Sequence, residues 1–212
     1  MSKLTHDITV SLDGYVAGPD PGPDQPLGAG GEALHEWVFG LKNWREAHGR
    51  EGGEDNEDSR LLQERLDSTG AGIMGRGMFG GGPGPWDESW KGWWDDEPPF
   101  GYPVFVLTHH PRDPLHFDNG ASFTFVTDGI ESALEQARAA AGEKDVHIGG
   151  GASVAQQYLR AGLLDELELH VVPLFLGGGV RLLDGIDPAR KLEIDRVIAS
   201  PTVTHMRYRV VG

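Results

Sequence analysis

Hydrophobic and polar positions divide the chain into an irregular first half and a regular second half. In the second half, short apolar runs alternate with segments in which apolar residues recur every three or four positions. The apolar runs predict strands, and the longer spacing predicts amphipathic helices. Strands are predicted at 103–108, 123–126, 146–148, 167–172, 192–199 and 202–211, and helices at 128–141 and 153–161.

The first half contains fewer regular elements and three long loops. Residues 4–11 alternate apolar and polar positions and predict a strand, and the short apolar run 72–75 predicts another. Apolar residues at helical spacing predict helices at 32–44 and 59–66. Loops are expected at about 18–31, 48–58 and 80–101, where glycine, proline and acidic residues are frequent. Loops of this length usually have a function or are mobile.

Capping signals refine the predicted helix ends. Ser59 is expected to cap the helix that follows it, because a serine hydroxyl accepts a free N–H of the first turn. Asp128 and Glu131 have the spacing of a capping box. Gly142 and Gly162 are expected to end the two later helices.

The order of elements predicts a single α/β domain spanning residues 1–212. Strands that alternate with helices favour a mostly parallel central sheet with helices on both faces, a three-layer α/β/α architecture. The last two strands, joined around Ser200-Pro201, predict an antiparallel hairpin at one edge of the sheet.

Composition narrows the possible partners and location. The chain has 212 residues, a formal net charge of −15 and no cysteine. The acidic balance argues against nucleic acid or an anionic membrane as the main partner. Without cysteine there is no disulfide, zinc-thiolate site or thiol nucleophile. The N-terminal residues lack a signal-peptide pattern, and no apolar run approaches the roughly 20 residues that span a bilayer, so a cytoplasmic location is expected.

The stretch 145–154 is the strongest candidate for chemistry. It consists of a short apolar strand, three consecutive glycines at 149–151, and the start of a predicted helix. Glycine allows backbone to approach a ligand closely, and the N-terminus of a helix offers free N–H groups to a phosphate. The segment therefore indicates a phosphate or dinucleotide cradle. A tight structural turn is the alternative interpretation.

Several motifs in order along the chain resemble one family. They are Val10-Ser11-Leu12-Asp13-Gly14-Tyr15-Val16-Ala17, Ile73-Met74-Gly75-Arg76-Gly77-Met78-Phe79, Val106-Leu107-Thr108-His109, the glycine stretch with Ala152-Ser153-Val154, and the run from Asp165 to Gly179. Together they resemble the dihydrofolate reductase fold, and most closely the branch that contains the reductase domain of bacterial riboflavin biosynthesis. The resemblance covers nearly the whole chain and is weakest at 18–58 and 80–101.

The resemblance implies that the protein binds NADPH. Arg76 is the natural partner of the 2′-phosphate or pyrophosphate, since a guanidinium fork suits such an anion. Further cofactor contacts are implied for Val10, Ser11, Ala17, Gly75, Gly77, Met78, Thr108, His109, Ile148, Gly149, Gly150, Gly151, Ala152, Ser153 and Val154.

Two acidic residues, Asp13 and Glu36, are the candidates for the proton donor. Asp13 ends the first strand beside the implied nicotinamide position, but it also fits an ordinary Asp-Gly turn. Glu36, like Glu32, lies on the first predicted helix, where dihydrofolate reductases have an acidic residue. A solvated helix face is the alternative for both glutamates. No metal site is expected.

Three functions remain open at this point. The first is an NADPH-dependent oxidoreductase that reduces a flat heterocycle such as a pyrimidine or pterin, with the 5-amino-6-(5-phosphoribosylamino)uracil reductase of riboflavin biosynthesis as a specific form. The second is a nucleotide-binding protein without turnover. The third is an interaction protein whose acidic, tryptophan-rich loops bind a partner. The resemblance also implies a homodimer.

Overall fold

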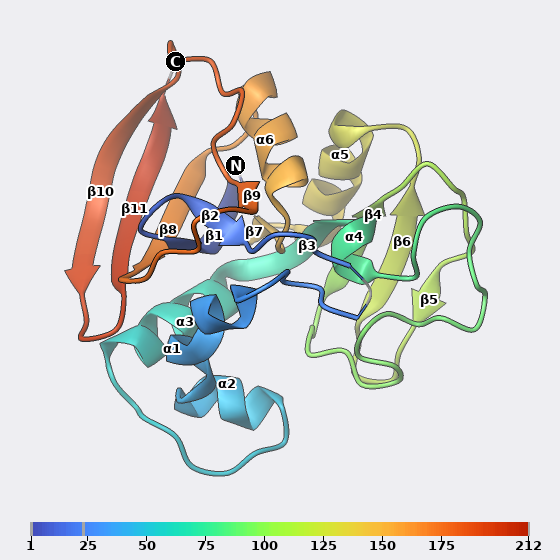
Figure 1. Ribbon diagram of the computed structural model, residues 1–212. Coiled ribbons are helices and arrows are strands. Elements are labelled where there is room, and N and C mark those ends of the chain that lie inside the picture. The colour runs from blue at the N-terminus through green and yellow to red at the C-terminus, as the bar shows by residue number, and fades with distance from the viewer. Residues whose placement is uncertain (1, 23, 212) are drawn as a thin grey trace. The chain divides into compact units, whose positions relative to one another are not determined.

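The structure is a computed structural model that describes residues 2–22 and 24–211 (Figure 1). Pro23, in the predicted loop 18–31, lies outside the described residues. The chain forms two compact units. The first unit contains the N-terminal residues up to His6 and Thr69–Leu164, and the second contains Asp7–Ser68 and the C-terminal residues from Asp165. Strand β1 (Leu4–Ser11) runs from the first unit into the second.

The first unit is built on parallel strands, as the alternating pattern predicts. Its strands are β3 (Thr69–Gly75), β4 (Pro103–Leu107), β5 (Leu115–His116), β6 (Ser122–Val126) and β7 (Asp145–Ile148). They follow the order β1-β7-β3-β4-β6-β5, and all neighbouring pairs are parallel except β5 with β6. The apolar run in β4 is buried on both faces, as expected for a central parallel strand.

Three helices belong to the first unit: α4 (Arg76–Phe79), α5 (Ile130–Ala141) and α6 (Ala152–Ala161). Helix α5 packs on β3, β4 and β7, and α6 packs on β3. Gly142 and Gly162 end α5 and α6 with positive φ, as predicted. The predicted capping box is wrong, because Gly129 occupies the N-cap of α5 and no side chain caps that end.

The second unit contains the antiparallel part of the sheet. Its strands are the second half of β1, β2 (Tyr15–Ala17), β8 (Glu166–Val172), β9 (Val180–Arg181), β10 (Lys191–Ala199) and β11 (Thr204–Val211). The order is β10-β11-β8-β1, and β2 pairs separately with β9. Strands β10 and β11 form the predicted C-terminal hairpin.

The predicted helix at 32–44 is interrupted in the structure. The segment forms the 3-10 helix η1 (Gly31–His35), then α1 (Glu36–Phe39) and α2 (Lys42–Ala47). Gly40 has a low helix propensity, and Leu41 adopts an extended conformation with ψ of 142°. The apolar spacing is thus maintained across three short turns rather than one helix.

Helix α3 (Glu57–Ser68) begins two residues before the predicted start. The Ser59 backbone N–H donates a 3.0 Å hydrogen bond to the Asn56 side-chain oxygen, so Asn56 rather than Ser59 supplies the cap. The Ser59 hydroxyl instead donates a bond to the Asn43 side chain. This early start brings Asp58 into the first turn of the helix, where it is 5% exposed.

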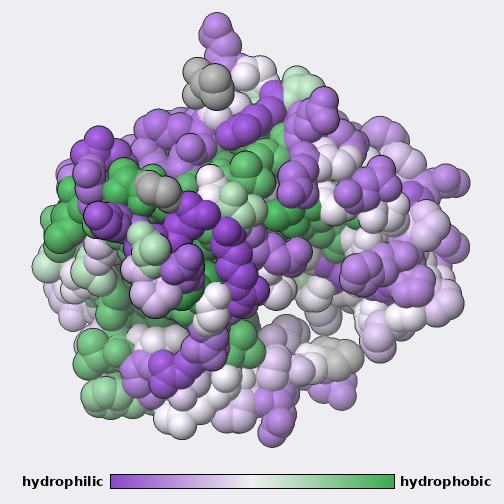
Figure 2. Space-filling model, turned by 90° about the horizontal axis from the view of Figure 1, so that it is seen from above, coloured by the Kyte–Doolittle hydropathy of each residue, from purple (hydrophilic) through white to green (hydrophobic). Residues whose placement is uncertain are grey.

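The four tryptophans of the 80–101 segment mainly serve packing. Trp86, Trp90 and Trp94 pack against the buried cluster around Phe79 and Phe123, whereas Trp93 is 41% exposed. The face shown in Figure 2 is mostly hydrophilic, with hydrophobic residues in smaller patches. In the described part of the chain, no helix is both long and apolar enough to cross a bilayer.

Candidate cofactor-binding site

The carboxyl ends of three neighbouring parallel strands meet at one edge of the first unit. Gly75 at the end of β3 pairs with Leu107 at the end of β4, and Ile73 pairs with Ile148 at the end of β7. Predicted cofactor residues follow each of these strand ends. In open α/β sheets this edge is where ligands bind. The structure therefore brings the first-unit part of the predicted site together.

Arg76 is the most informative side chain at this edge. It starts α4 directly after β3, and its guanidinium carbon lies 3.8 Å from the centroid of the Trp86 ring. All three guanidinium nitrogens are buried, and none has a hydrogen-bond partner among the described residues. Burial lowers the pKa of Arg76, but a guanidinium remains charged at neutral pH. A buried cation without hydrogen bonds is costly, and an anion would satisfy it.

The Trp86 ring, on which the Arg76 guanidinium stacks, is fixed by a hydrogen bond of its own. The Trp86 indole N–H donates a 2.8 Å hydrogen bond to the His110 carbonyl oxygen, just beyond β4. A second guanidinium, that of Arg112, lies 5.4 Å from the same ring and pairs with Glu88 at 3.3 Å. Two cations thus share one indole, which favours a negatively charged ligand nearby.

At the start of α6 the glycine turn 149–151 leaves space at Gly149 and Gly151, whereas a Cβ atom at Gly150 would lie 2.7 Å from the Met78 sulfur. Gly150 and Gly151 have φ of +62° and +70°, conformations that favour glycine. A Cβ atom at Gly151 would meet nothing within 4 Å, and one at Gly149 would meet only the Ile73 carbonyl oxygen at 4.0 Å. No side chain caps α6, so its first N–H groups are free of a side-chain partner. This geometry suits a phosphate.

The remaining predicted residues of the first unit have different surroundings. Some are buried and shape the edge, whereas others are exposed and accessible to a ligand. The buried ones are Thr108, Ile148, Ala152 and Val154; the exposed ones are Gly77, Met78, His109 and Ser153.

Two of the buried residues act through the backbone or through packing. The Thr108 hydroxyl accepts a 3.1 Å hydrogen bond from the His110 N–H and thereby fixes the turn after β4. Val154 packs so closely on the end of β3 that a Cβ at Gly75 would lie 2.9 Å from its Cγ2 atom. Glycine at position 75 is therefore required for the packing of α6 on β3.

The predicted nicotinamide residues and Asp13 lie in the second unit. Val10 and Ser11 are buried in β1, and Ala17 ends β2. The Ser11 hydroxyl donates a 2.6 Å hydrogen bond to Asp13 and accepts a 2.9 Å bond from the Tyr15 N–H. The turn after β1 is thus closed by its own side chains.

Asp13 is bound by three donors. Besides Ser11, the backbone N–H groups of Leu176 and Gly177 donate to its carboxylate at 3.1 and 2.8 Å. The Ser11 bond and these backbone bonds lower the pKa of Asp13. An ionised carboxylate with this many donors is well suited to hold the 174–177 loop and poorly suited to donate a proton.

Glu36 and Glu32 are both exposed in the second unit, at the starts of α1 and η1. Their position fits the solvated-face interpretation. Trp86 and Arg112 were not among the predicted cofactor contacts. No local pattern points to them, because their role depends on a loop that returns to Arg76 across the ends of β3 and β4. Among the described residues, no group of three or more His, Asp or Glu side chains is arranged to hold a metal ion.

The fold resembles that of dihydrofolate reductase-like proteins. The chain is similar to dihydrofolate reductase from Enterococcus faecalis, solved with NADP(H), with 15% identity, a TM-score of 0.53, and coverage of 99% of this chain and 97% of that one. This likeness confirms the predicted α/β fold with its mostly parallel sheet and antiparallel edge hairpin.

Two further similar structures have descriptions that refer to riboflavin biosynthesis. A protein of Shewanella sp. PV-4 described as a riboflavin biosynthesis protein has 20% identity and a TM-score of 0.66, and each chain covers 99% of the other. The deaminase/5-amino-6-(5-phosphoribosylamino)uracil reductase of Thermotoga maritima has 13% identity and a TM-score of 0.57. The alignment covers 99% of this chain and 57% of that one. No curated protein matches the sequence.

The family itself is identified by sequence. The model of the RibD C-terminal domain matches residues 2–206, nearly the whole chain. The protein therefore belongs to the RibD C-terminal domain family, which confirms the resemblance found in its motifs.

Proposed function

We propose that the protein is an NADPH-dependent reductase that transfers hydride to a flat heterocyclic substrate. Family membership and the dihydrofolate reductase-like fold support a reductase. The single observation that carries the cofactor assignment is the buried Arg76 guanidinium, stacked on Trp86 and without hydrogen bonds among the described residues. NADPH, when bound, supplies the hydride.

The chain's own residues would bind and orient the cofactor. Arg76 would pair with a phosphate group, and Arg112 would add positive charge on the same indole. Glycines 149–151 and the uncapped start of α6 would accept a second phosphate through backbone N–H groups. Because a guanidinium fork favours a dianionic phosphate monoester, we expect NADPH to bind more tightly than NADH.

A pyrimidine substrate of riboflavin biosynthesis is the specific form of this proposal. It is supported by the RibD C-terminal family and by the likeness to the Thermotoga maritima reductase. A pterin is the other flat heterocycle to test, given the likeness to dihydrofolate reductase.

A nucleotide-binding protein without turnover is the alternative. It is favoured by the state of Asp13, whose carboxylate is occupied by three hydrogen-bond donors, and by the exposure of Glu36. A reductase with this chain would take the proton from another carboxyl group or from water.

A homodimer is also proposed, from the apolar face of the C-terminal hairpin. The bulge between Ile194 and Arg196 places Leu192, Ile194 and Val197 on one face, opposite Val210, Tyr208 and Met206. The three β10 residues are 40%, 67% and 53% exposed. Hydrophobic surface also reaches the left edge of Figure 2, the side on which Figure 1 draws β10. A second copy would cover this face, and Ile194→Asp should shift sedimentation toward a monomer.

The test of function combines binding with turnover. The purified protein is titrated with NADPH and with NADH while tryptophan fluorescence is recorded. Micromolar affinity for NADPH and weaker binding of NADH support the cofactor site. Loss of NADPH absorbance on addition of a pyrimidine or pterin then separates a reductase from the non-catalytic alternative. Absence of binding to either nucleotide at millimolar concentration would overturn the proposal.

A further inference from the structure

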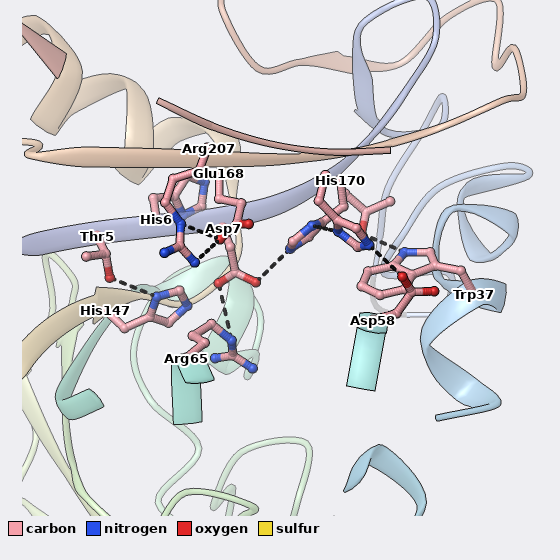
Figure 3. Close-up of polar contacts among 12 residues, drawn as sticks. Thr5, His6, Asp7, Trp37, Asp58, Arg65, His147, Glu168, His170 and Arg207 are labelled. Carbon is pink, nitrogen blue, oxygen red and sulfur yellow. Dashed lines mark hydrogen bonds and ion pairs between the residues drawn. The ribbon is translucent and has the colours of Figure 1, made fainter. Parts of the chain in front are cut away.

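A chain of polar side chains with a buried histidine pair at its centre joins four elements of the second unit (Figure 3). Strands β8 and β11 pair so that His170 lies directly opposite His205. Their Nδ1 atoms are 2.7 Å apart. The Nε2 atom of His170 lies 3.1 Å from an Asp7 carboxylate oxygen, and that of His205 lies 3.0 Å from Asp58. Three consecutive hydrogen bonds therefore run from β1 to α3.

The number of protons in this chain follows from the chemistry of its members. Each of the three hydrogen bonds needs one proton. Two neutral imidazoles between two carboxylates supply only two, because an ionised carboxylate accepts and cannot donate. One further proton must be present, on an imidazole or on a carboxyl at either end. The closed chain is thus a group that binds one proton beyond the neutral state.

Its surroundings are suited to that extra positive charge. With one imidazolium, Asp7, His170, His205 and Asp58 together have a net charge of −1. The Arg65 guanidinium lies 3.5 Å from Asp7 and balances it. His170 and His205 are 7% and 1% exposed, so exchange with bulk water is restricted.

The other polar groups around the pair are hydrogen-bonded or favour their neutral form. Burial, and to a smaller extent the electrostatic effect of His170, lowers the pKa of His35 in η1, which favours its neutral form. Glu168, on β8, is bound by the Arg207 guanidinium at 2.8 and 3.1 Å. The Ser200 hydroxyl donates to the same Asp58 oxygen that faces His205.

An indole also covers both imidazoles. The Trp37 ring lies 5.1 Å from that of His170 and 5.2 Å from that of His205, and its N–H donates to Thr9. Burial and then the neighbouring His170 lower the pKa of His205, while Asp58 opposes them. These influences favour the neutral form of His205.

We propose that the His170–His205 pair is a proton-binding site that locks β1, β8, β11 and α3 together only while it holds one proton more than two neutral imidazoles. Removing that proton leaves two lone pairs facing each other at the centre of the chain. Adding another places two N–H groups against each other. Either change breaks a hydrogen bond that is buried.

The expected pH dependence follows from counting protons in both states. In the unfolded chain, two independent histidines with pKa of about 6.5 hold three ring protons in total at that pH, equal to the folded pair. Above it the folded state binds more protons than the unfolded state, so stability falls as pH rises. Below it the unfolded state binds more, so stability falls as pH falls. The contribution of the pair is therefore greatest near pH 6.5.

The first test is chemical unfolding of wild type and the double variant His170→Gln/His205→Gln, which removes both titrating rings, from pH 5.5 to 8.5. The ratio of the wild-type to the double-variant folding equilibrium constant should peak near pH 6.5 and fall roughly 25-fold by pH 8.5, if the pair keeps its proton over this range. His116→Gln, which removes an exposed histidine, is the matched control and should give a flat ratio. A ratio for the double variant that is independent of pH would overturn the proposal.

The second test does not require a variant that folds. Nitrogen-15 NMR of the histidine rings in the wild-type protein distinguishes imidazolium from neutral imidazole and identifies the tautomer of each ring. At pH 6.5 the pair should show three protonated ring nitrogens. The alternative is two protonated ring nitrogens together with a carbon-13 shift typical of a protonated carboxyl group at Asp7 or Asp58. Two neutral rings between two ionised carboxylates would overturn the assignment.

Discussion

The two units treat buried charge in opposite ways. In the first, the Arg76 guanidinium is buried on Trp86 with no hydrogen bond among the described residues. In the second, the His170 and His205 side chains are buried as well, but each ring bonds through both nitrogens. The first arrangement is incomplete without a ligand, whereas the second is closed by its own side chains. Burial alone therefore does not indicate a binding site, whereas a guanidinium with all three nitrogens buried and none hydrogen-bonded among the described residues is a candidate for one.

The largest effect is expected for the substitution of Arg76, which tests the comparison in the first unit. Arg76→Ala should weaken NADPH binding by roughly 10- to 150-fold, because a charge-assisted pair with phosphate contributes about 1.5–3 kcal/mol. The free energy of unfolding should stay the same or rise, since the variant loses a cation that lacks hydrogen bonds. Isothermal titration and denaturant unfolding measure the two quantities.

Arg160→Ala, on the exposed end of α6, is the control and should change neither quantity. If Arg76→Ala instead destabilised the protein and left NADPH affinity unchanged, Arg76 would be a structural residue and the contrast between the units would disappear.

The second expected effect concerns the closed chain. Asp58 accepts hydrogen bonds from His205 and from the Ser200 hydroxyl while 5% exposed. Asp58→Asn presents an amide to these donors and should lower the free energy of unfolding at pH 6.5 by about 2–4 kcal/mol. Asp55→Asn, at an exposed position just before α3, should have no effect in the same denaturant experiment. Equal stability of the two variants would show that the chain contributes little.

Much of the fold could be predicted from the sequence because its strands are local apolar patterns. The second half matched closely, from the buried β4 to the hairpin of β10 and β11. The errors lie where a side chain competes with the pattern. The Asn56 side chain replaced Ser59 as the cap of α3, and Gly40 divided the expected helix. Such outcomes depend on contacts between residues that spacing alone does not show.

The candidate site could be predicted in part for the same reason. The glycine turn and Arg76 each follow a strand directly, so the sequence locates them at a common edge. Trp86 is ten residues beyond Arg76 in an irregular loop, and only the folded chain brings its ring under the guanidinium. The His170–His205 pair gave no signal either, because it depends on the register of two strands that are distant in sequence.

A smaller effect sharpens the claim that the first unit leaves space for a ligand. A Cβ at Gly75 would lie 2.9 Å from Val154, whereas one at Gly77 meets nothing within 4 Å. Gly75→Ala should therefore destabilise the protein by about 1–2 kcal/mol through overpacking. Gly77→Ala, within α4, should stabilise it by about 0.5–1 kcal/mol. Thermal unfolding distinguishes them. Weaker NADPH binding by the stable Gly77→Ala would place the ligand in that space.

The smallest expected effect is local and tests the anchoring role of Asp13. Asp13→Asn should speed hydrogen exchange at the Leu176 and Gly177 amides, which donate to its carboxylate, without changing global stability. Because these bonds lower the pKa of Asp13, the loop contact is complete above the ordinary aspartate pKa of 3.8 and is lost as pH falls below it. Asp118→Asn, at an exposed position in the first unit, should leave both amides unchanged. If the Leu176 and Gly177 amides of wild type already lose their protection, measured against intrinsic exchange rates, at pH 5, this role is contradicted. Asp13 would then return to the candidates for proton transfer, because a carboxyl with a raised pKa can donate.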